Sequence, residues 1–509
     1  MEELQNTSLV GEGLEGSEDV LAGIQFSLDS LKANADTFFL IVMACLIFFM
    51  QCGFAFLEAG SVRSKNTTNI LIKNVLDVCL GAFAYWAVGY AFAFGPGNAF
   101  LGHRYFFFEN MPPSLYSHWF FHFVFAATAT TIVSGAMAER TEFGAYLIYS
   151  CVITGVIYPI VSHWAWSGNG WLAAGPGVEG VAYQDFAGSG VVHMVGGMAA
   201  LVGAAIVGPR LGRFDKQGNP TTIPGHTVPL AALGGFILFF GFFAFNGGSQ
   251  ASISQPGDGE VVAVSIVNTI ISGGHAALVA MVIKKLKGFN GQWSLLITIN
   301  GALTGMVAIC AGCNVLAPWG AAVVGIVSGA VYVLWSWLVC KLRIDDPLDA
   351  VAVHLGGGLW GVFSVPILGF ETGVVFAWNQ VAFMNLGWNA LGAVAIICWT
   401  GILSAILFGL MRLLGVLRVS SEIEEKGLDI AKHGESAYPL SSYGHGWSSE
   451  ANLIEVRVDG KGSAADLTDS GSASSNAKDG CHGILPAQVY QISQTESSGQ
   501  ATVGESANI

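Results

Sequence analysis

Charged residues are scarce in this sequence of 509 residues: Asp, Glu, Lys and Arg together make up only 11% of it. Soluble globular domains carry roughly 25% charged residues. Hydrophobic residues make up 53% of the chain. The shortage of charge excludes a series of soluble domains and indicates a protein that crosses a membrane several times.

Basic residues are especially few. The chain has 21 Lys and Arg against 35 Asp and Glu, which gives a formal net charge of −14. A nucleic-acid-binding domain needs a clustered basic surface to neutralise phosphates. Here the basic residues fall mainly in short loops between apolar runs, so we exclude nucleic acid as a partner.

Cysteine is also sparse, and its placement argues against a disulfide framework. Eight of the nine Cys lie in or beside apolar runs, where a free Cys behaves as a small hydrophobic residue. Cys310 and Cys313 have a metal-like spacing, but no second pair and no His partner accompany them. The His-Glu-x-x-His pattern of a zinc enzyme is absent as well. We therefore expect no metal, no other cofactor and no enzymatic activity.

Long apolar runs dominate the rest of the chain. A helix needs roughly 20 apolar residues to cross about 30 Å of hydrocarbon. On this criterion we expect eleven transmembrane helices, at residues 37–60, 69–94, 118–137, 143–163, 186–207, 228–247, 261–283, 292–311, 317–339, 350–368 and 385–411. The fold class is thus an all-α polytopic membrane protein.

The loop charges alternate along this series. Loops after odd-numbered spans carry nearly all the Lys and Arg, whereas loops after even-numbered spans carry Arg104 alone. Because cytoplasmic loops are enriched in Lys and Arg, the N-terminus is predicted outside and the C-terminus in the cytosol.

The chain outside the spans is polar. Residues 1–36 are acidic and lack the basic start and apolar stretch of a secretory leader, so we expect no cleavable signal peptide. Because the loop charges place the N-terminus outside, we expect these residues to form an extracellular segment. Asn6 fits a glycosylation acceptor, which matters only if this end is extracellular. We divide the remainder into a transport domain at 37–413, a cytosolic regulatory tail at 414–447 with one short helix, and a disordered tail at 448–509 that is rich in Ser and Gly.

An Asp followed by a His opens two of the expected spans. Asp185 precedes His193 at the outer end of the fifth span, and Asp349 precedes His354 at the inner end of the tenth. Two five-helix units of opposite orientation plus one additional helix would produce this arrangement, as in the inverted repeats of transporters. We expect both imidazoles to approach the middle of the bilayer from opposite faces, where ionisable residues usually mark a pathway.

Seven motifs then occur in order: FHFVFA at 121–126, GAMAER at 135–140, HWAW at 163–166, DFAGSGVVH at 185–193, GFFAFNGGS at 241–249, DDPLD at 345–349 with His354, and GLDIAKHG at 427–434. With them the chain resembles the ammonium transporters of the Amt/Mep/Rhesus family, on the Amt side. The resemblance covers about residues 37–438. It implies a homotrimer in the plasma membrane, with one pore per subunit and a tail that couples neighbouring subunits.

The resemblance also implies roles for individual residues. Trp166, Phe125 and Ser249 match the outer site that recruits ammonium, and Asp185 matches the family's structural and recruiting aspartate. Two further sets complete the match: the stacked gate Phe125 and Phe245, and the histidine pore His193 and His354. Ala431 stands where plant relatives carry a phosphorylatable Thr, so that switch is not expected here.

These residue types suit the chemistry. Aromatic faces attract a cation, and a hydroxyl supplies an acceptor for its N–H groups. Potassium has the same charge, so its rejection requires a step that potassium cannot make, such as the loss of a proton. An apolar gate penalises an intact cation more than neutral ammonia, and histidine can carry the separated proton. Methylammonium is expected to act as an analogue.

Alternatives remain open for both the residues and the function. Trp166 is also typical of an interfacial anchor. The Asp185 carboxylate is also typical of a structural charge that complements the dipole at a helix N-terminus. The functional alternatives are an electroneutral, Rhesus-like facilitator of ammonia, an ammonium sensor that signals through its tail, and an intramembrane metalloenzyme that uses the two His.

Overall fold

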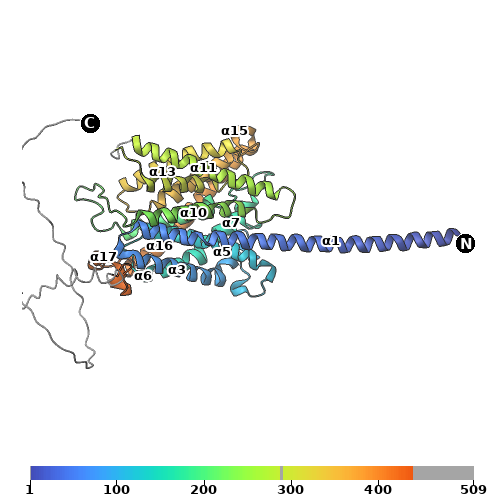
Figure 1. The fold of residues 1–509 in the computed structure, drawn as a ribbon, viewed down its shortest axis with the longest axis horizontal. Coiled ribbons are helices and arrows are strands. Elements are labelled where there is room, and N and C mark those ends of the chain that lie inside the picture. The colour runs from blue at the N-terminus through green and yellow to red at the C-terminus, as the bar shows by residue number, and fades with distance from the viewer. Residues whose placement is uncertain (1, 287–290, 440–509) are drawn as a thin grey trace, which may run out of the picture. The chain divides into compact units, whose positions relative to one another are not determined.

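The computed structural model describes residues 2–286 and 291–439, and within these residues the only regular elements are helices. All of them belong to one unit of the chain, Met1–Ser442 (Figure 1). The predicted disordered tail at 448–509 lies outside the described residues, as does the end of the regulatory tail from residue 440.

The α-helices follow one another along the chain as α1 (Glu2–Phe48), α2 (Met50–Ser61), α3 (Thr67–Ala84), α4 (Tyr90–Phe94), α5 (Tyr116–Ala136), α6 (Phe143–Val152), α7 (Tyr158–Trp166), α8 (Trp171–Ala174), α9 (Val195–Val207), α10 (Val228–Gly247), α11 (Asp258–Leu286), α12 (Leu295–Ile309), α13 (Pro318–Lys341), α14 (Gly357–Leu368), α15 (Val374–Ala377), α16 (Gln380–Leu413) and α17 (Ser421–Lys426). π-Helical turns are η2 (Tyr85–Gly89), η5 (Ile153–Ile157), η6 (Ser189–Met194), η8 (Val351–Gly356) and η9 (Asp429–His433), and 3₁₀ turns are η1 (Ser64–Asn66), η3 (Phe106–Phe108), η4 (Pro113–Leu115) and η7 (Gly248–Gln250).

Ten helical segments of the described residues are long and apolar enough to cross a bilayer, and they coincide with ten of the eleven expected spans. The exception is the eighth expected span at 292–311. There the structure has α12, with 15 residues, which is about 22 Å at 1.5 Å per residue. Eleven full-length spans are therefore not confirmed.

The early end of α12 has a structural cause. After Ile309 the chain turns, and the carbonyls of Cys310 and Ala311 accept hydrogen bonds from the N–H groups of Ala187 and Phe186, at 2.9 and 3.0 Å. Backbone that leaves a helix at membrane depth needs such partners, because no water satisfies it there. These bonds join the end of α12 to the segment that precedes His193.

The N-terminal segment is continuous with the first span. α1 begins at Glu2 and extends beyond the other helices toward the N-terminus (Figure 1). Asp36 of α1 is bonded to the loop after α10: its carboxylate accepts hydrogen bonds from the N–H groups of Ile253 and Ser254 and from the Ser254 hydroxyl.

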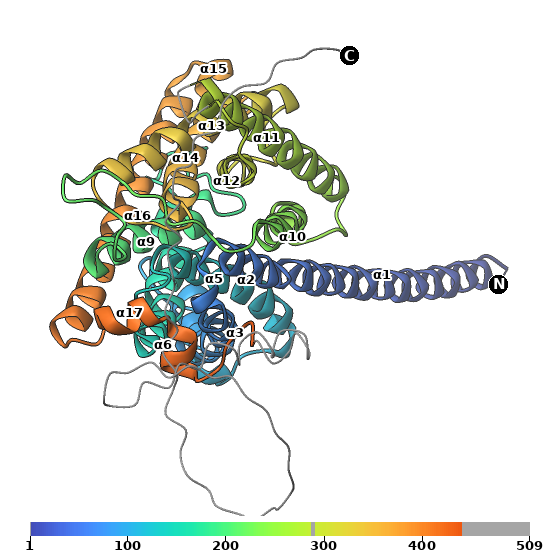
Figure 2. The same cartoon turned by 60° about the vertical axis from the view of Figure 1, so that its left-hand side comes forward.

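Helices α5 and α9 lie between α3 and α6 on one side and α11 and α13 on the other (Figure 2). Small residues permit close contact in this central region. A Cβ atom placed on Gly197 of α9 would overlap the backbone of Leu355 in η8. Glycine at this crossing thus brings the two His-bearing segments together, as small residues generally do between membrane helices.

Candidate functional site

His193 lies in a π-helical turn whose start is held by Asp185. The Asp185 carboxylate accepts hydrogen bonds from the N–H groups of Gly188, Gly190 and Val191, at 3.0, 2.9 and 2.9 Å. Burial raises the pKa of Asp185 to about 6, although these N–H groups act in the opposite direction. The carboxylate therefore caps the helix that carries His193. This contact agrees with the alternative that Asp185 complements the dipole at a helix N-terminus.

His354 lies in an equivalent turn, η8, which follows the DDPLD motif at 345–349. The aspartate that caps η8 is Asp346, whose carboxylate accepts the N–H of Val351 at 2.7 Å. Asp349 has a φ of 58° and accepts hydrogen bonds from the hydroxyls of Tyr332 and Ser336, at 2.8 and 3.1 Å. Because the backbone at Asp349 is left-handed, its side chain is directed to α13. Asp346 therefore caps η8 in its place.

The two imidazoles meet inside the bundle. Their ring centroids are 5.2 Å apart with an interplanar angle of 22°, and their Nδ1 atoms are 3.2 Å apart. His193 is fully buried and His354 is 6% exposed. Two nitrogens at this distance share one proton, so one ring donates and the other accepts.

A series of rings leads to this pair. The centroids of Trp166 and Phe125 are 5.8 Å apart, those of Phe125 and Phe245 are 4.3 Å apart, and those of Phe245 and His193 are 5.4 Å apart. Phe125 and Phe245 are both buried, whereas Trp166 is partly exposed. The rings from Trp166 to His354 thus form one uninterrupted sequence of contacts.

Ser249 joins this series through the backbone. Its hydroxyl donates a hydrogen bond to the carbonyl of Phe245 at 2.8 Å and is partly exposed. A hydroxyl that donates in this way keeps its lone pairs for another donor. Asp185 is connected to Trp166 by its carbonyl, which accepts the indole N–H at 2.7 Å.

Several neighbours of the site were missed by the sequence analysis. Phe121 and His122 pack on Phe125 from the same helix, with centroids 4.9 and 6.3 Å away. Phe242 stacks on His193 at 5.7 Å, and the Cys310 sulfur lies 3.7 Å from His193 Nε2. The aromatic neighbours could have been predicted, because they lie three or four residues before Phe125 or Phe245 and thus on the same face of a helix.

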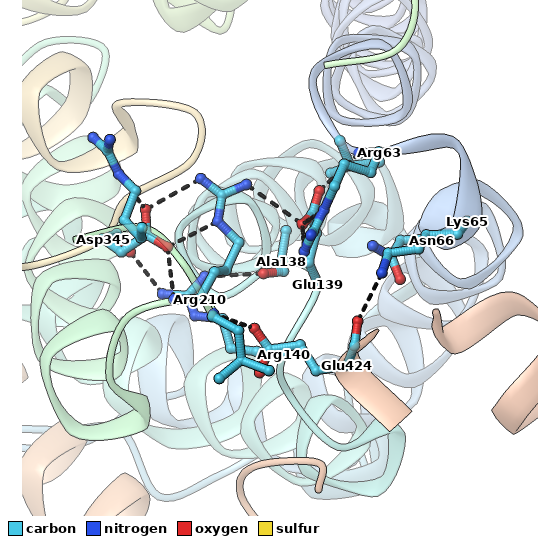
Figure 3. Close-up of polar contacts among 12 residues, drawn as sticks. Arg63, Lys65, Asn66, Ala138, Glu139, Arg140, Arg210, Asp345 and Glu424 are labelled. Atoms are coloured by element: carbon cyan, nitrogen blue, oxygen red, sulfur yellow. Dashed lines mark hydrogen bonds and ion pairs between the residues drawn. The ribbon is translucent and has the colours of Figure 1, made fainter. Parts of the chain in front are cut away.

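A cluster of ion pairs surrounds Asp345 in the loops between the helices (Figure 3). Arg210 binds Asp345 through Nε at 2.8 Å and contacts Glu139 at 3.5 Å, and Glu139 also accepts a bond from Arg63 at 2.7 Å. Arg213 binds the second Asp345 oxygen at 3.1 Å. Burial by itself raises the pKa of Asp345, but the Arg210 bonds and nearby guanidinium charges lower it to about 2. Several of the basic residues that indicated the topology thus belong to a buried network.

The segment that follows α16 contacts loops of its own chain near this cluster. The Asp429 carboxylate accepts the N–H groups of Thr68 and Asn69 at 3.0 and 2.8 Å. Glu424 of α17 accepts the N–H of Leu211 at 2.7 Å and binds Arg418 at 2.8 Å. The expected short helix is present as α17, and it is bonded to the loop that also carries Arg210.

The helical bundle and the buried ring series through it define a multi-pass membrane protein of the transporter class. The chain belongs to the Ammonium Transporter Family, because the family model matches residues 38–438. A Caenorhabditis elegans protein named for ammonium transport is 51% identical over 446 residues, which are 83% of each chain. The tomato (Solanum lycopersicum) protein Ammonium transporter 1 member 3 is 40% identical over 81% of this chain and 95% of its own. These matches confirm the family resemblance that the seven motifs indicated.

Solved structures agree. A structure described as a sensor Amt protein is 33% identical, with a TM-score of 0.73 over 80% of this chain and 100% of its own. Candida albicans Mep2 is 24% identical, with a TM-score of 0.69 over 78% of this chain and 88% of its own, and shows the shared fold alone.

Proposed function

We propose that this protein carries ammonium across a membrane and separates it into ammonia and a proton on the way. The observation that carries the proposal is the continuous series of ring contacts from Trp166 through the Phe125 and Phe245 pair to His193 and His354. The relatives are named as ammonium transporters, and methylammonium is the analogue of that substrate.

The outer end of the series suits a cation. A cation near an aromatic face gains about 0.5–2 kcal/mol, depending on how far it is desolvated. Trp166 and Phe125 offer such faces, and the Ser249 hydroxyl supplies lone pairs for an N–H donor. The Asp185 carboxylate contributes negative potential at this end while it caps η6.

The pair of rings Phe125 and Phe245, whose planes are inclined by 31°, acts as the gate. An intact cation at membrane depth costs several kcal/mol, whereas neutral ammonia passes an apolar constriction at a lower cost. Ammonium overcomes the gate by losing its proton, and potassium cannot do so. His193 and His354 then relay the proton, and the net movement is one positive charge per ammonia.

We further propose that the protein is a homotrimer in the plasma membrane, with the N-terminus outside the cell and the tail in the cytosol. The loop charges support this orientation. The bonds of Asp429 and Glu424 to the cytosolic face support a tail that controls transport.

Current recorded in a heterologous cell on addition of ammonium, methylammonium or potassium tests the proposal. We expect inward current with the first two and none with potassium. Methylammonium uptake without any current would favour the electroneutral, Rhesus-like alternative. Current carried equally by potassium would reject the deprotonation step.

A sensor function is the second candidate, because one structural relative is described as a sensor. A sensor would bind ammonium and lose a tail-dependent signal, with transport intact, when the tail is removed. The metalloenzyme alternative receives no support, since no group of three or more potential metal ligands is found within residues 2–286 and 291–439.

A further inference from the structure

His122 occupies the outer end of the ring series, beside the two residues assigned to cation binding. Its ring centroid lies 5.8 Å from that of Trp166 and 6.3 Å from that of Phe125. Trp166 and Phe125 are themselves 5.8 Å apart. The three rings thus form a nearly equilateral triangle, and a cation can be attracted by a ring whose centroid is within about 6 Å.

The imidazole is positioned by its own helix and by α4. His122 follows His118 by one turn of α5, and their centroids are 4.3 Å apart. Phe94 packs on His122 at 4.1 Å. His118 is engaged elsewhere, since its Nδ1 lies 3.0 Å from the Tyr90 hydroxyl. The Tyr90 hydroxyl of α4 therefore bonds His118, and no residue of α4 forms such a bond with His122.

The Nδ1 atom of His122 is buried and has no hydrogen-bond partner among the described residues. A buried polar atom without a partner costs about 1–3 kcal/mol, so such atoms often mark a place where a ligand binds. A neutral imidazole nitrogen offers one lone pair. The aromatic faces of Trp166 and Phe125 contribute attraction, but neither provides an in-plane acceptor for an N–H group.

We propose that His122 is a further ammonium-binding residue of the outer site, with Nδ1 accepting one N–H of the cation held by Trp166 and Phe125. This inference rests on the proposed function, and it adds a selectivity step that precedes the gate. Ammonium donates directed N–H bonds, whereas hard cations without N–H groups prefer oxygen ligands to imidazole nitrogen. The nitrogen acceptor therefore favours ammonium over potassium before any proton is lost.

Binding of radiolabelled methylammonium to the purified protein, with displacement by ammonium chloride or potassium chloride, tests the inference. His122→Phe keeps a ring and removes the acceptor, and we expect ammonium to displace the label about tenfold less effectively, because a hydrogen bond to a charged group is lost. Displacement by potassium should not change. His122→Gln restores an acceptor and should recover most of the loss.

His275→Phe is the matched control, because that histidine is exposed on α11 and its Nδ1 is within 2.8 Å of the Ile271 carbonyl. We expect unchanged displacement in this variant. His122→Leu removes the acceptor with a smaller side chain, so that it decides the question if the Phe variant does not fold.

Displacement by ammonium in the Phe and Leu variants that equals that of the unmodified protein would overturn the inference, and so would an absence of any binding to the unmodified protein. Binding requires no transport. A protein that binds in a His122-dependent way but carries no current therefore contradicts the proposed function and leaves this inference standing.

Discussion

The Nδ1 atoms of His193 and His354 lie 3.2 Å apart, although 161 positions separate the two residues in the chain. Each histidine lies in a π-helical turn at the start of a helix, and each turn is capped by an aspartate, Asp185 or Asp346. The pair thus arises where two segments far apart in the chain meet, and the proposed relay depends on this contact.

Replacing either histidine with an apolar residue should abolish or sharply reduce ammonium current, because the separated proton loses its carrier. Replacing one with Glu should preserve current but admit potassium, since a fixed negative charge stabilises an intact cation. Current and methylammonium uptake are measured in parallel. Normal current with unchanged potassium exclusion in a variant that lacks both His193 and His354 would defeat the relay.

Trp166→Leu should weaken the recruitment of the cation and leave the fold intact. The loss of about 1–2 kcal/mol of cation–π energy corresponds to a roughly tenfold change in apparent affinity or turnover. The measurement is the concentration dependence of ammonium current and methylammonium uptake. Trp399→Leu is a control for the loss of a partly buried indole hydrogen bond, since Trp399 donates to the Ile157 carbonyl and is not part of the ring series. An unchanged concentration dependence in Trp166→Leu would favour the interfacial-anchor interpretation.

Truncation before Ser420 should reduce transport without preventing membrane insertion. The shortened chain loses the bonds from Glu424 to Leu211 and from Asp429 to the start of α3. Truncation after residue 439 keeps these contacts and is the matched control. Transport per correctly located protein is measured, and full activity of the shorter chain would remove the proposed role of the tail.

Asp345→Asn should destabilise the protein by about 3–5 kcal/mol, because it leaves the buried Arg210 guanidinium with only its longer contact to Glu139 at 3.5 Å. The folded pKa of about 2 lies below the ordinary value of 3.8. The contribution of Asp345 to stability is therefore complete above about pH 4 and is lost as the pH falls toward 2. Thermal unfolding of the detergent-solubilised protein is measured against Glu422→Gln, an exposed carboxylate. Equal stability of the two variants would contradict the prediction.

Tags at the two ends of the chain test the orientation. We expect an N-terminal tag to be accessible on intact cells and a C-terminal tag to become accessible only after permeabilisation. The expectation requires the short helix α12 to connect opposite faces of the membrane, despite its 15 residues. Accessibility of both tags on intact cells would show that the number of crossings is even, and accessibility of the C-terminal tag alone would reverse the predicted orientation.

The sequence by itself determined the membrane class, ten of the spans and the family. Scarce charge and long apolar runs are properties of composition, and the bilayer imposes a length that can be counted along the chain. The motifs also contained the residues of the ring series, because Phe125, Trp166 and Phe245 lie within recognisable local patterns.

Only the tertiary structure decided how these residues meet. It showed that Asp346, and not Asp349, caps the turn of His354, because the left-handed backbone at Asp349 directs that side chain to Tyr332. It also showed that α12 ends at Ile309, where the next two carbonyls accept backbone bonds from the segment after Asp185, and it brought His122 beside Trp166. These contacts join residues far apart in the chain, and periodicity and composition carry no information about which distant partner completes a hydrogen bond or a ring contact.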